Sequence, residues 1–306
     1  MKTLKQLRQK TFLLVLMLSI LFLNAPATEK QEINKTFKPM EVVEISTVSG
    51  DCKIITGKDN KILVNLVYTY STDKFEPILK EEGNTLILKE EFNSSSWGSS
   101  HRGESSWTLT VPEKTKIEFS SASGDLNAAG LKGGLSARVA SGDLNVKDSK
   151  GKLKFKAASG DIEMKHSSGE ISVKTASGDI ELSNVQGEFD VKTASGDINA
   201  SGIHFTGESD LKSVSGDMLV ELSKSNEYDL DLSTVSGNIT LDYKGNPVKG
   251  YFGFKGMKGK ISSDIPFDSK EKSSQYNPFV KKFFKKGGDS PEISLKTVSG
   301  KLTFKK

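Results

Sequence analysis

The chain has 306 residues, with 43 Lys and Arg against 39 Asp and Glu, and a single cysteine. One cysteine excludes an internal disulfide framework. Four of the basic residues and no acidic ones lie in the first 27 positions, which leaves 39 of each sign in the remainder and gives no general reason to expect a nucleic-acid partner.

Residues 1–27 are predicted to be a secretory signal peptide. A basic start is followed by an apolar run from Phe12 to Leu23 and by the small residues Ala25-Pro26-Ala27. The run is too short for a membrane span, and no cysteine stands near the cleavage site to carry a lipid anchor. We therefore expect export, with the mature chain starting at residue 28 in the periplasm, at the cell surface or outside the cell.

Residues 28–120 are predicted to form an N-terminal β region continuous with the repeats that follow. Residues 28–40 suggest a flexible lead-in, and residues 74–82 a short helical turn weakened by Pro77. Strands are expected at 62–70, 85–92 and 107–111. The serine- and glycine-rich loop 93–106 carries Trp97, either as a sugar or partner contact or within a loose connection.

Residues 121–306 are organised by a repeat. Glycines recur every nine residues, and alternate ones carry the signature Ala-Ser-Gly-Asp, so the full repeat is eighteen residues. The signature glycines and aspartates are Gly124, Gly142, Gly160, Gly178, Gly196, Asp125, Asp143, Asp161, Asp179 and Asp197.

After each glycine, apolar and polar residues alternate with period two, as in Ile162-Glu163-Met164, which indicates short strands and excludes a helix. We predict an all-β fold: a parallel β-solenoid, or β-helix-like stack, of 18-residue coils made of two 9-residue halves. Each Ser-Gly-Asp would be a corner, where glycine supplies positive φ and aspartate bonds the turn backbone. The Ala or Val before each Ser-Gly would form an inward column.

The period breaks at residues 264–292, predicted to be an insert loop that caps the stack. It contains the basic-aromatic residues Lys281, Lys282, Phe283 and Phe284. Such a run could touch anionic lipid or a partner, and we expect membrane contact only through this 281–286 loop.

Stacking would align the signature aspartates in an acidic ladder that must be solvated or neutralised. A basic ladder of Arg138, Lys156, Lys174 and Lys192 would face outward. Two interpretations stay open for these cations. They compensate the acidic ladder on a solubilising surface, or they form a linear face for an anionic polymer.

No catalytic, metal or cofactor site is predicted. The three histidines lack metal-ligand spacing, and the glycine-aspartate pattern only partly matches a calcium-binding β-roll. Cys52 falls in register with the inward columns and is expected to be a small buried hydrophobe rather than a nucleophile.

Units such as Thr193-Ala-Ser-Gly-Asp197, together with Leu109–Ile117 and Leu295–Gly300, resemble the putative-adhesin family of bacterial β-strand-repeat proteins, a domain of unknown function. The resemblance covers about residues 41–306. It implies a cell-envelope or surface protein and carries no catalytic residues.

Three functional hypotheses remain. The first is a non-enzymatic envelope protein that binds an anionic envelope polymer, a glycan or a surface protein, without nucleic acid. The second is a carbohydrate-active, pectinase-like β-helix that acts on a polysaccharide through aspartates in a groove. The third is an envelope-stress or scaffold component with protein partners.

Overall fold

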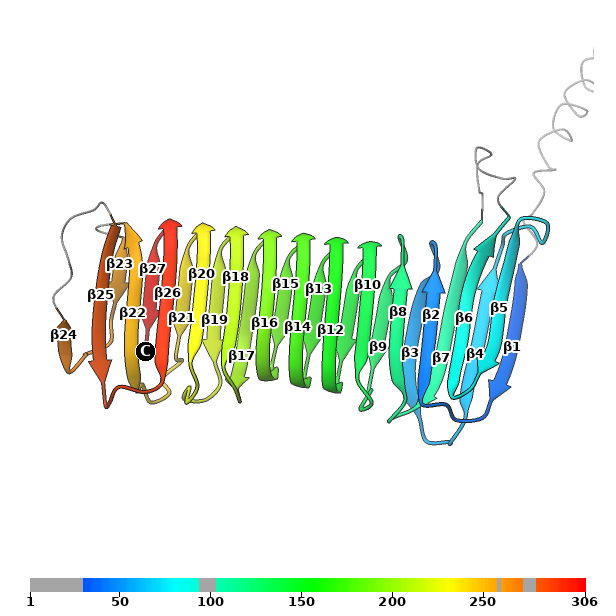
Figure 1. Cartoon of the computed structure of the whole chain (residues 1–306), viewed down its shortest axis with the longest axis horizontal. Coiled ribbons are helices and arrows are strands. Elements are labelled where there is room, and N and C mark those ends of the chain that lie inside the picture. Colours follow the sequence, from blue (N-terminus) through cyan, green and yellow to red (C-terminus); the bar gives the residue numbers. More distant parts are fainter. Residues whose placement is uncertain (1–29, 94–102, 258–259, 272–278) are drawn as a thin grey trace, which may run out of the picture.

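The computed structural model describes residues 30–93, 103–257, 260–271 and 279–306. The predicted signal peptide and Trp97 lie outside these ranges. The described residues form 27 strands in one hydrogen-bonded network, arranged as two facing layers of an elongated stack (Figure 1). The predicted all-β, solenoid-like class is therefore confirmed. No helix in the described part of the chain is long and apolar enough to cross a membrane.

The central repeats alternate between a layer of longer strands and a layer of shorter ones. The long-strand layer contains β8 (Lys116–Ser121), β10 (Leu135–Ser141), β12 (Lys150–Ser159), β14 (Ser168–Ser177), β16 (Gln186–Ser195), β18 (Ser209–Ser215) and β20 (Leu230–Ser236). The short-strand layer contains β9 (Leu126–Ala129), β11 (Leu144–Lys147), β13 (Ile162–Lys165), β15 (Ile180–Ser183), β17 (Ile198–Phe205), β19 (Met218–Leu222) and β21 (Ile239–Asp242). Strand β17 is longer than the others because its end also pairs with β16 of the long-strand layer.

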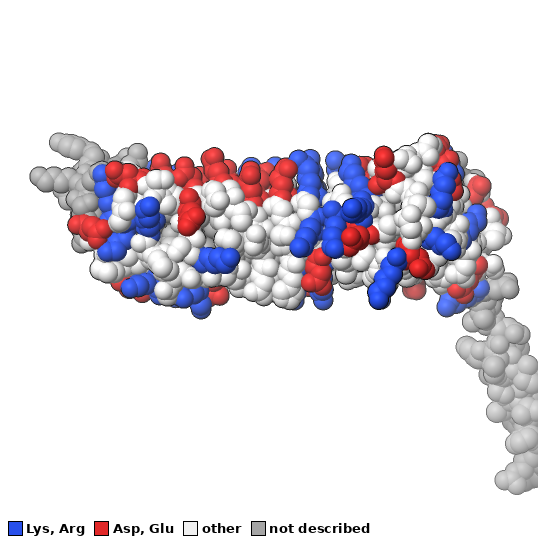
Figure 2. Space-filling model, turned by 90° about the horizontal axis from the view of Figure 1, so that it is seen from below, with Lys and Arg blue, Asp and Glu red and all other residues white. Residues whose placement is uncertain are grey.

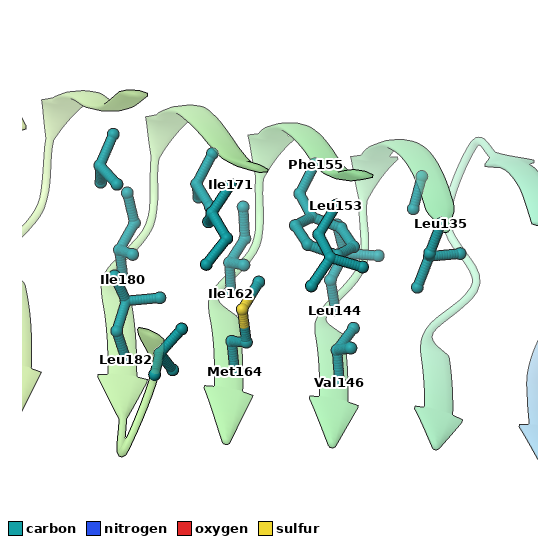
Figure 3. Packing of buried hydrophobic residues seen from close by; sticks show 14 of the residues in the cluster. Leu135, Leu144, Val146, Leu153, Phe155, Ile162, Met164, Ile171, Ile180 and Leu182 are labelled. Atoms are coloured by element: carbon teal, nitrogen blue, oxygen red, sulfur yellow. The ribbon is translucent and has the colours of Figure 1, made fainter. Parts of the chain in front are cut away.

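Parallel pairing places each residue beside its copy in the next repeat. In the long-strand layer Leu153 lies beside Ile171 and Phe155 beside Val173, and in the short-strand layer Ile162 lies beside Ile180. These apolar side chains point into the space between the layers (Figure 3) and are almost completely buried. Burying each large aliphatic side chain contributes about 1.5–3 kcal/mol before entropy is subtracted.

The N-terminal end of the stack changes from parallel to antiparallel pairing. Its strands are β1 (Gln31–Phe37), β2 (Val42–Thr47), β3 (Asp51–Gly57), β4 (Ile62–Tyr68), β5 (Phe75–Glu82), β6 (Thr85–Phe92) and β7 (Ser105–Pro112). Strands β2 and β3 continue the parallel layers through β8 and β9, whereas the β1–β4, β4–β7 and β5–β6 pairs are antiparallel.

Two expectations for this end were wrong. The predicted lead-in 28–40 contains strand β1, and the predicted helical turn at 74–82 is strand β5. Phe75 buries its ring against Tyr68 and Tyr70, which anchors the start of β5 to the core. Among the described strands β5 pairs only with β6, so Pro77 stands on an edge strand, where proline is tolerated.

At the C-terminal end the order in space departs from the order in sequence. Strands β26 (Glu292–Ser299) and β27 (Leu302–Lys305) pair with β20 and β21. Strands β22 (Gly250–Met257) and β23 (Ile261–Ser263) lie beyond them. The last strands of the chain are thus inserted one coil before the end of the stack (Figure 1).

The predicted insert loop 264–292 is not a simple loop, because it contains β24 (Ser269–Glu271) and β25 (Phe279–Lys286). Strand β25 runs antiparallel to β22 and covers the edge that β22 would otherwise expose. Alternation along β25 also places Phe283 and Phe284 on opposite faces of the strand. Phe284 packs toward the core and stacks on Phe267 at 4.6 Å, whereas Phe283 stacks on Tyr251 at 5.5 Å.

Candidate binding surface

The signature glycines stack directly above one another at the corners. A Cβ added to Gly142, Gly160 or Gly178 would lie closer than 3.0 Å to the carbonyl oxygen of the glycine one coil earlier. The predicted positive φ is found at Gly160, Gly178 and Gly196 (156°, 158° and 147°) but not at Gly124 or Gly142, so it explains only part of the glycine pattern. The corners require glycine because neighbouring backbones approach too closely for a side chain.

The residue before each Ser-Gly does not form an inward column, contrary to expectation. Strand alternation continues through Thr175, which is buried, so the following Ala176 faces solvent. The same holds for Thr234 and Val235, whose exposed fraction is 48%. The corners therefore form an outward ridge, which we call the corner ridge. Its exposed residues, from the N-terminal end of the stack, are Val48, Ala122, Ala140, Ala158, Ala176, Ala194, Val214, Val235, Val298 and Met257.

The aspartates of the corner ridge bond to the next coil rather than to their own turn. The backbone N–H of Asp143 donates to Oδ1 of Asp125 at 2.8 Å, and the N–H of Asp161 donates to Oδ1 of Asp143 at 2.9 Å. The same bond continues to Asp197 and joins Asp51 to Asp125 at 3.0 Å. Each carboxylate thus satisfies a backbone donor, which offsets the repulsion between neighbouring carboxylates.

Two substitutions of Asp179 distinguish the contribution of its hydrogen-bond acceptor from that of its negative charge. We expect Asp179→Ala to lower the free energy of unfolding by about 1 kcal/mol, because the N–H of Asp197 loses its acceptor. Asp179→Asn should cost less than half of that, since Asn238 already fills a rung and accepts from Lys301 N–H at 2.9 Å. Urea unfolding of both variants tests this, and equal losses would show that the negative charge matters instead.

The basic ladder lies on the outer face of the long-strand layer, where Arg138, Lys156, Lys174 and Lys192 are neighbours across β10, β12, β14 and β16. Half of it is neutralised. Asp190 binds Lys174 at 2.8 Å and Lys192 at 2.6 Å. Burial raises the pKa of Asp190, but the hydrogen bonds from the two lysines outweigh burial and leave the pKa below its usual value.

Arg138 and Lys156 have no ion pair among the described residues, and the compensating carboxylate of the ladder is Asp190 rather than the corner aspartates. Strand β12 adds cations that the sequence analysis did not select. Lys150, Lys152, Lys154 and Lys156 stand at every second position and share its outer face, whereas Leu153 and Phe155 are buried. Within the described part of the chain, Lys152 alone of these four lysines has an ion pair, with Glu170 at 2.6 Å.

We call Lys150, Lys152, Lys154, Lys156 and the adjacent Arg138 the β12 basic cluster. Two residues along a strand span about 6.6 Å and two strands about 4.8 Å, so the cluster presents a compact grid of positive charge. The signal for it is present in the sequence, as lysine at every second position from 150 to 156.

The same layer becomes acidic toward the C-terminal repeats, and Figure 2 shows acidic side chains along the rim there and basic ones nearer the middle. Glu208, Asp210, Asp229, Asp231 and Glu292 line a surface depression. Lys212 binds Asp210 at 2.8 Å and Lys296 binds Asp231 at 3.0 Å, so part of this charge is compensated. Within the described ranges no group of three or more His, Cys, Asp or Glu residues is arranged to hold a metal ion.

Cys52 is 1% exposed, in the inward position expected for it. Burial raises the pKa of its thiol far above the usual value, and the nearby charges of Glu90 and Asp51 raise it further. The thiolate that nucleophilic chemistry needs is therefore strongly disfavoured.

The remaining predicted contacts are separated from the β12 basic cluster. Lys282, Phe283 and Phe284 are half-buried in strand β25 at the C-terminal end. Lys281 belongs to the same strand and pairs with Lys255 of β22. The structure thus does not join the 281–286 segment to the basic ladder in one surface.

The stacked strands, glycine corners and solvent-facing charge columns define a non-globular, solenoid-like β-repeat protein. The family profile described as Toastrack DUF4097 matches residues 40–264. Since this match spans well over half of the chain, the protein belongs to the Toastrack family, a domain of unknown function, which agrees with the resemblance to putative adhesins. No curated protein matches the chain.

Solved bacterial structures share the fold. One is described as a "putative adhesin" from Parabacteroides distasonis, with 11% identity, a TM-score of 0.50, and coverage of 91% of this chain and 97% of the other. Another, from the same species, is described as a "putative lipid binding protein", with 14% identity, a TM-score of 0.50, and coverage of 90% and 96%. At these identities the likeness concerns the fold alone.

Proposed function

We propose that this protein is exported and non-enzymatic, and that it binds an anionic polymer of the cell envelope through the β12 basic cluster. The observation that carries this proposal is that the cations are regularly spaced and that most of them have no carboxylate partner among the described residues. Arg138, Lys154 and Lys156 lie on adjacent strands and have no ion pair among the described residues. Positive charges that no carboxylate neutralises are available to a polyanion.

The layered scaffold suits such a role. A coil of eighteen residues in two halves repeats its outer positions at the strand spacing, about 4.8 Å, so charges are displayed at fixed intervals along one face. A linear polymer with regularly spaced phosphates or carboxylates can contact several coils at once, and each contact raises the effective concentration of the next. The envelope location in this proposal rests on the predicted signal peptide.

The proposed site is tested with Lys154→Glu/Lys156→Glu in the chain from residue 28 onward. We expect binding of inorganic polyphosphate to weaken at least tenfold, about 1.4 kcal/mol. The matched control is Lys53→Glu/Lys147→Glu, which makes the same charge change on the short-strand layer, where both lysines are exposed. Isothermal titration calorimetry measures the affinity of each variant. An equal loss of affinity in both double variants would show that binding depends on net charge and not on the β12 basic cluster.

Asp190→Asn provides the opposite test. Removing this carboxylate frees Lys174 and Lys192, so the basic ladder should gain two available cations and polyphosphate binding should tighten by about three- to tenfold at low salt. The gain should disappear near 1 M salt, where the screening length is about 3 Å. Unchanged affinity at low salt would show that the basic ladder lies outside the binding site.

A further inference from the structure

The corner ridge changes its chemistry at the C-terminal end of the stack. In the middle coils its exposed apolar residues are alanines. In the last four coils they are Val214, Val235, Val298 and Met257, with exposed fractions of 54%, 48%, 47% and 37%. Pairing of β18, β20 and β26 places the three valines beside one another, and the register of β22 with β26, continued by two residues beyond Lys255 and Lys296, places Met257 beside Val298. Strand spacing separates them by about 4.8 Å each.

The charge of the ridge reverses over the same coils. In successive coils, the position of the ladder aspartate is occupied by Asp197, Asp217, Asn238, Lys301 and Lys260. All these residues occupy the same structural position. Backbone N–H groups of the neighbouring coil donate to the carbonyls of Asp217 (2.9 Å), Asn238 (2.8 Å), Lys301 (2.9 Å) and Lys260 (2.9 Å) in turn. Lys260 and Lys301 are exposed and have no ion pair among the described residues.

We propose that this end of the corner ridge, formed by Val214, Val235, Val298, Met257, Lys260 and Lys301, docks on an anionic lipid surface. The occupant follows from the pairing of two features. A row of exposed apolar side chains on a projecting edge can enter the headgroup and acyl boundary, and adjacent lysines are attracted to the negative surface potential of anionic lipids. A soluble polyanion would use the lysines and leave the apolar row without a function.

This inference goes beyond the proposed polymer binding and uses different residues. It also moves the expected membrane contact away from 281–286, where Phe284 packs toward the core and Lys286 binds Asp268 at 2.7 Å. Charge contrast along the ridge orients the molecule, because the aspartates of the middle coils are repelled by the same surface that attracts Lys260 and Lys301.

The test uses the chain from residue 28 onward and flotation with vesicles of phosphatidylglycerol and phosphatidylcholine. We expect binding to mixed vesicles, with at least tenfold weaker binding to pure phosphatidylcholine. Two variants separate the contributions: Val235→Ser/Val298→Ser/Met257→Ser removes apolar contacts, and Lys260→Gln/Lys301→Gln removes charge. Each should weaken binding at least fivefold without moving the unfolding midpoint, since all five side chains are exposed.

The matched controls are Ala158→Ser/Ala176→Ser, on the same ridge among aspartates, and Lys154→Glu/Lys156→Glu in the β12 basic cluster. Both should bind vesicles as the parent chain does. A single tryptophan, Val298→Trp, should shift its emission to shorter wavelength only with mixed vesicles. Three results overturn the proposal: no vesicle binding, binding that the serine variant retains in full, or binding lost only in the β12 variant. Retention by the serine variant with loss by the glutamine variant would indicate a polyanion or acidic protein partner instead.

Discussion

Replacing Gly178 by alanine is expected to lower the free energy of unfolding by about 3 kcal/mol or more. The added Cβ would collide with the carbonyl oxygen of Gly160 in the preceding coil. Both groups are backbone, and adjacent ladders on either side hold them in place. The coils cannot separate locally without lengthening these bonds, so the cost is at the upper end of what overpacking usually produces.

The measurement is urea unfolding followed by circular dichroism, with the midpoint and the slope compared between variants. Gly253→Ala is the matched control, because the nearest atom to its added Cβ is a side-chain carbon of Phe283 at 3.4 Å. Its effect should stay within about 1 kcal/mol. A Gly178 variant as stable as this control would contradict the close approach of the corners.

Removing the buried carboxylate of Glu90 should have an effect of similar size. Glu90 is 3% exposed and accepts three hydrogen bonds. Ser105 Oγ and Trp107 Nε1 donate to one oxygen at 2.5 and 2.9 Å, and the N–H of Val48 donates to the other at 2.7 Å. At the first corner of the described residues, Val48–Asp51, a Cβ added to Gly50 would collide with Oε1 of Glu90, so this carboxylate stands where later corners have the backbone of the preceding coil.

We expect Glu90→Leu to cost about 3–5 kcal/mol, because three buried donors lose their acceptor. Glu90→Gln keeps one acceptor but turns an NH2 group toward a donor, so a smaller loss of about 1–2 kcal/mol is expected. Glu91→Gln, which removes the exposed partner of Lys89, should cost less than about 0.5 kcal/mol. The same unfolding assay ranks the three variants. A Glu90→Leu variant as stable as Glu91→Gln would contradict the stabilising role of the buried Glu90 carboxylate.

The stacked fold could be predicted because the period of the sequence is the period of the structure. When Leu153, Ile171 and Phe189 recur every eighteen residues, placing them beside one another is the arrangement that buries all three, and the register follows. Alternation likewise predicted β6 at the observed bounds, Thr85–Phe92.

Features that depend on contacts between coils could not be predicted in the same way. Positive φ was predicted at the glycine corners and holds at Gly160, Gly178 and Gly196, but a repeat does not reveal how closely two backbones approach. The corner aspartates were expected to bond their own turns, whereas their acceptors serve the next coil. The outward position of Ala176 depends on the residue at which strand alternation stops. If alternation stopped one residue earlier or later, a side chain would face the core instead of solvent.

The candidate site was predicted only in part. Periodicity located Arg138 and Lys156, but it could not show that Asp190 binds Lys174 and Lys192. Lys150, Lys152 and Lys154 were not predicted as a site, because the eighteen-residue period aligns residues across coils and not along one strand. The proposed lipid-docking end of the ridge could not be predicted from the sequence, because β22 follows β26 in space but precedes it in the chain.

The most direct test of the polymer-binding account is a salt series of polyphosphate titrations on the chain from residue 28 onward. We predict that affinity falls steadily with ionic strength, and that Lys154→Glu/Lys156→Glu weakens binding at low salt and flattens this dependence. Lys53→Glu/Lys147→Glu should follow the parent curve closely. Identical curves for the two double variants, or an affinity that salt does not change, would contradict a binding role for the β12 basic cluster.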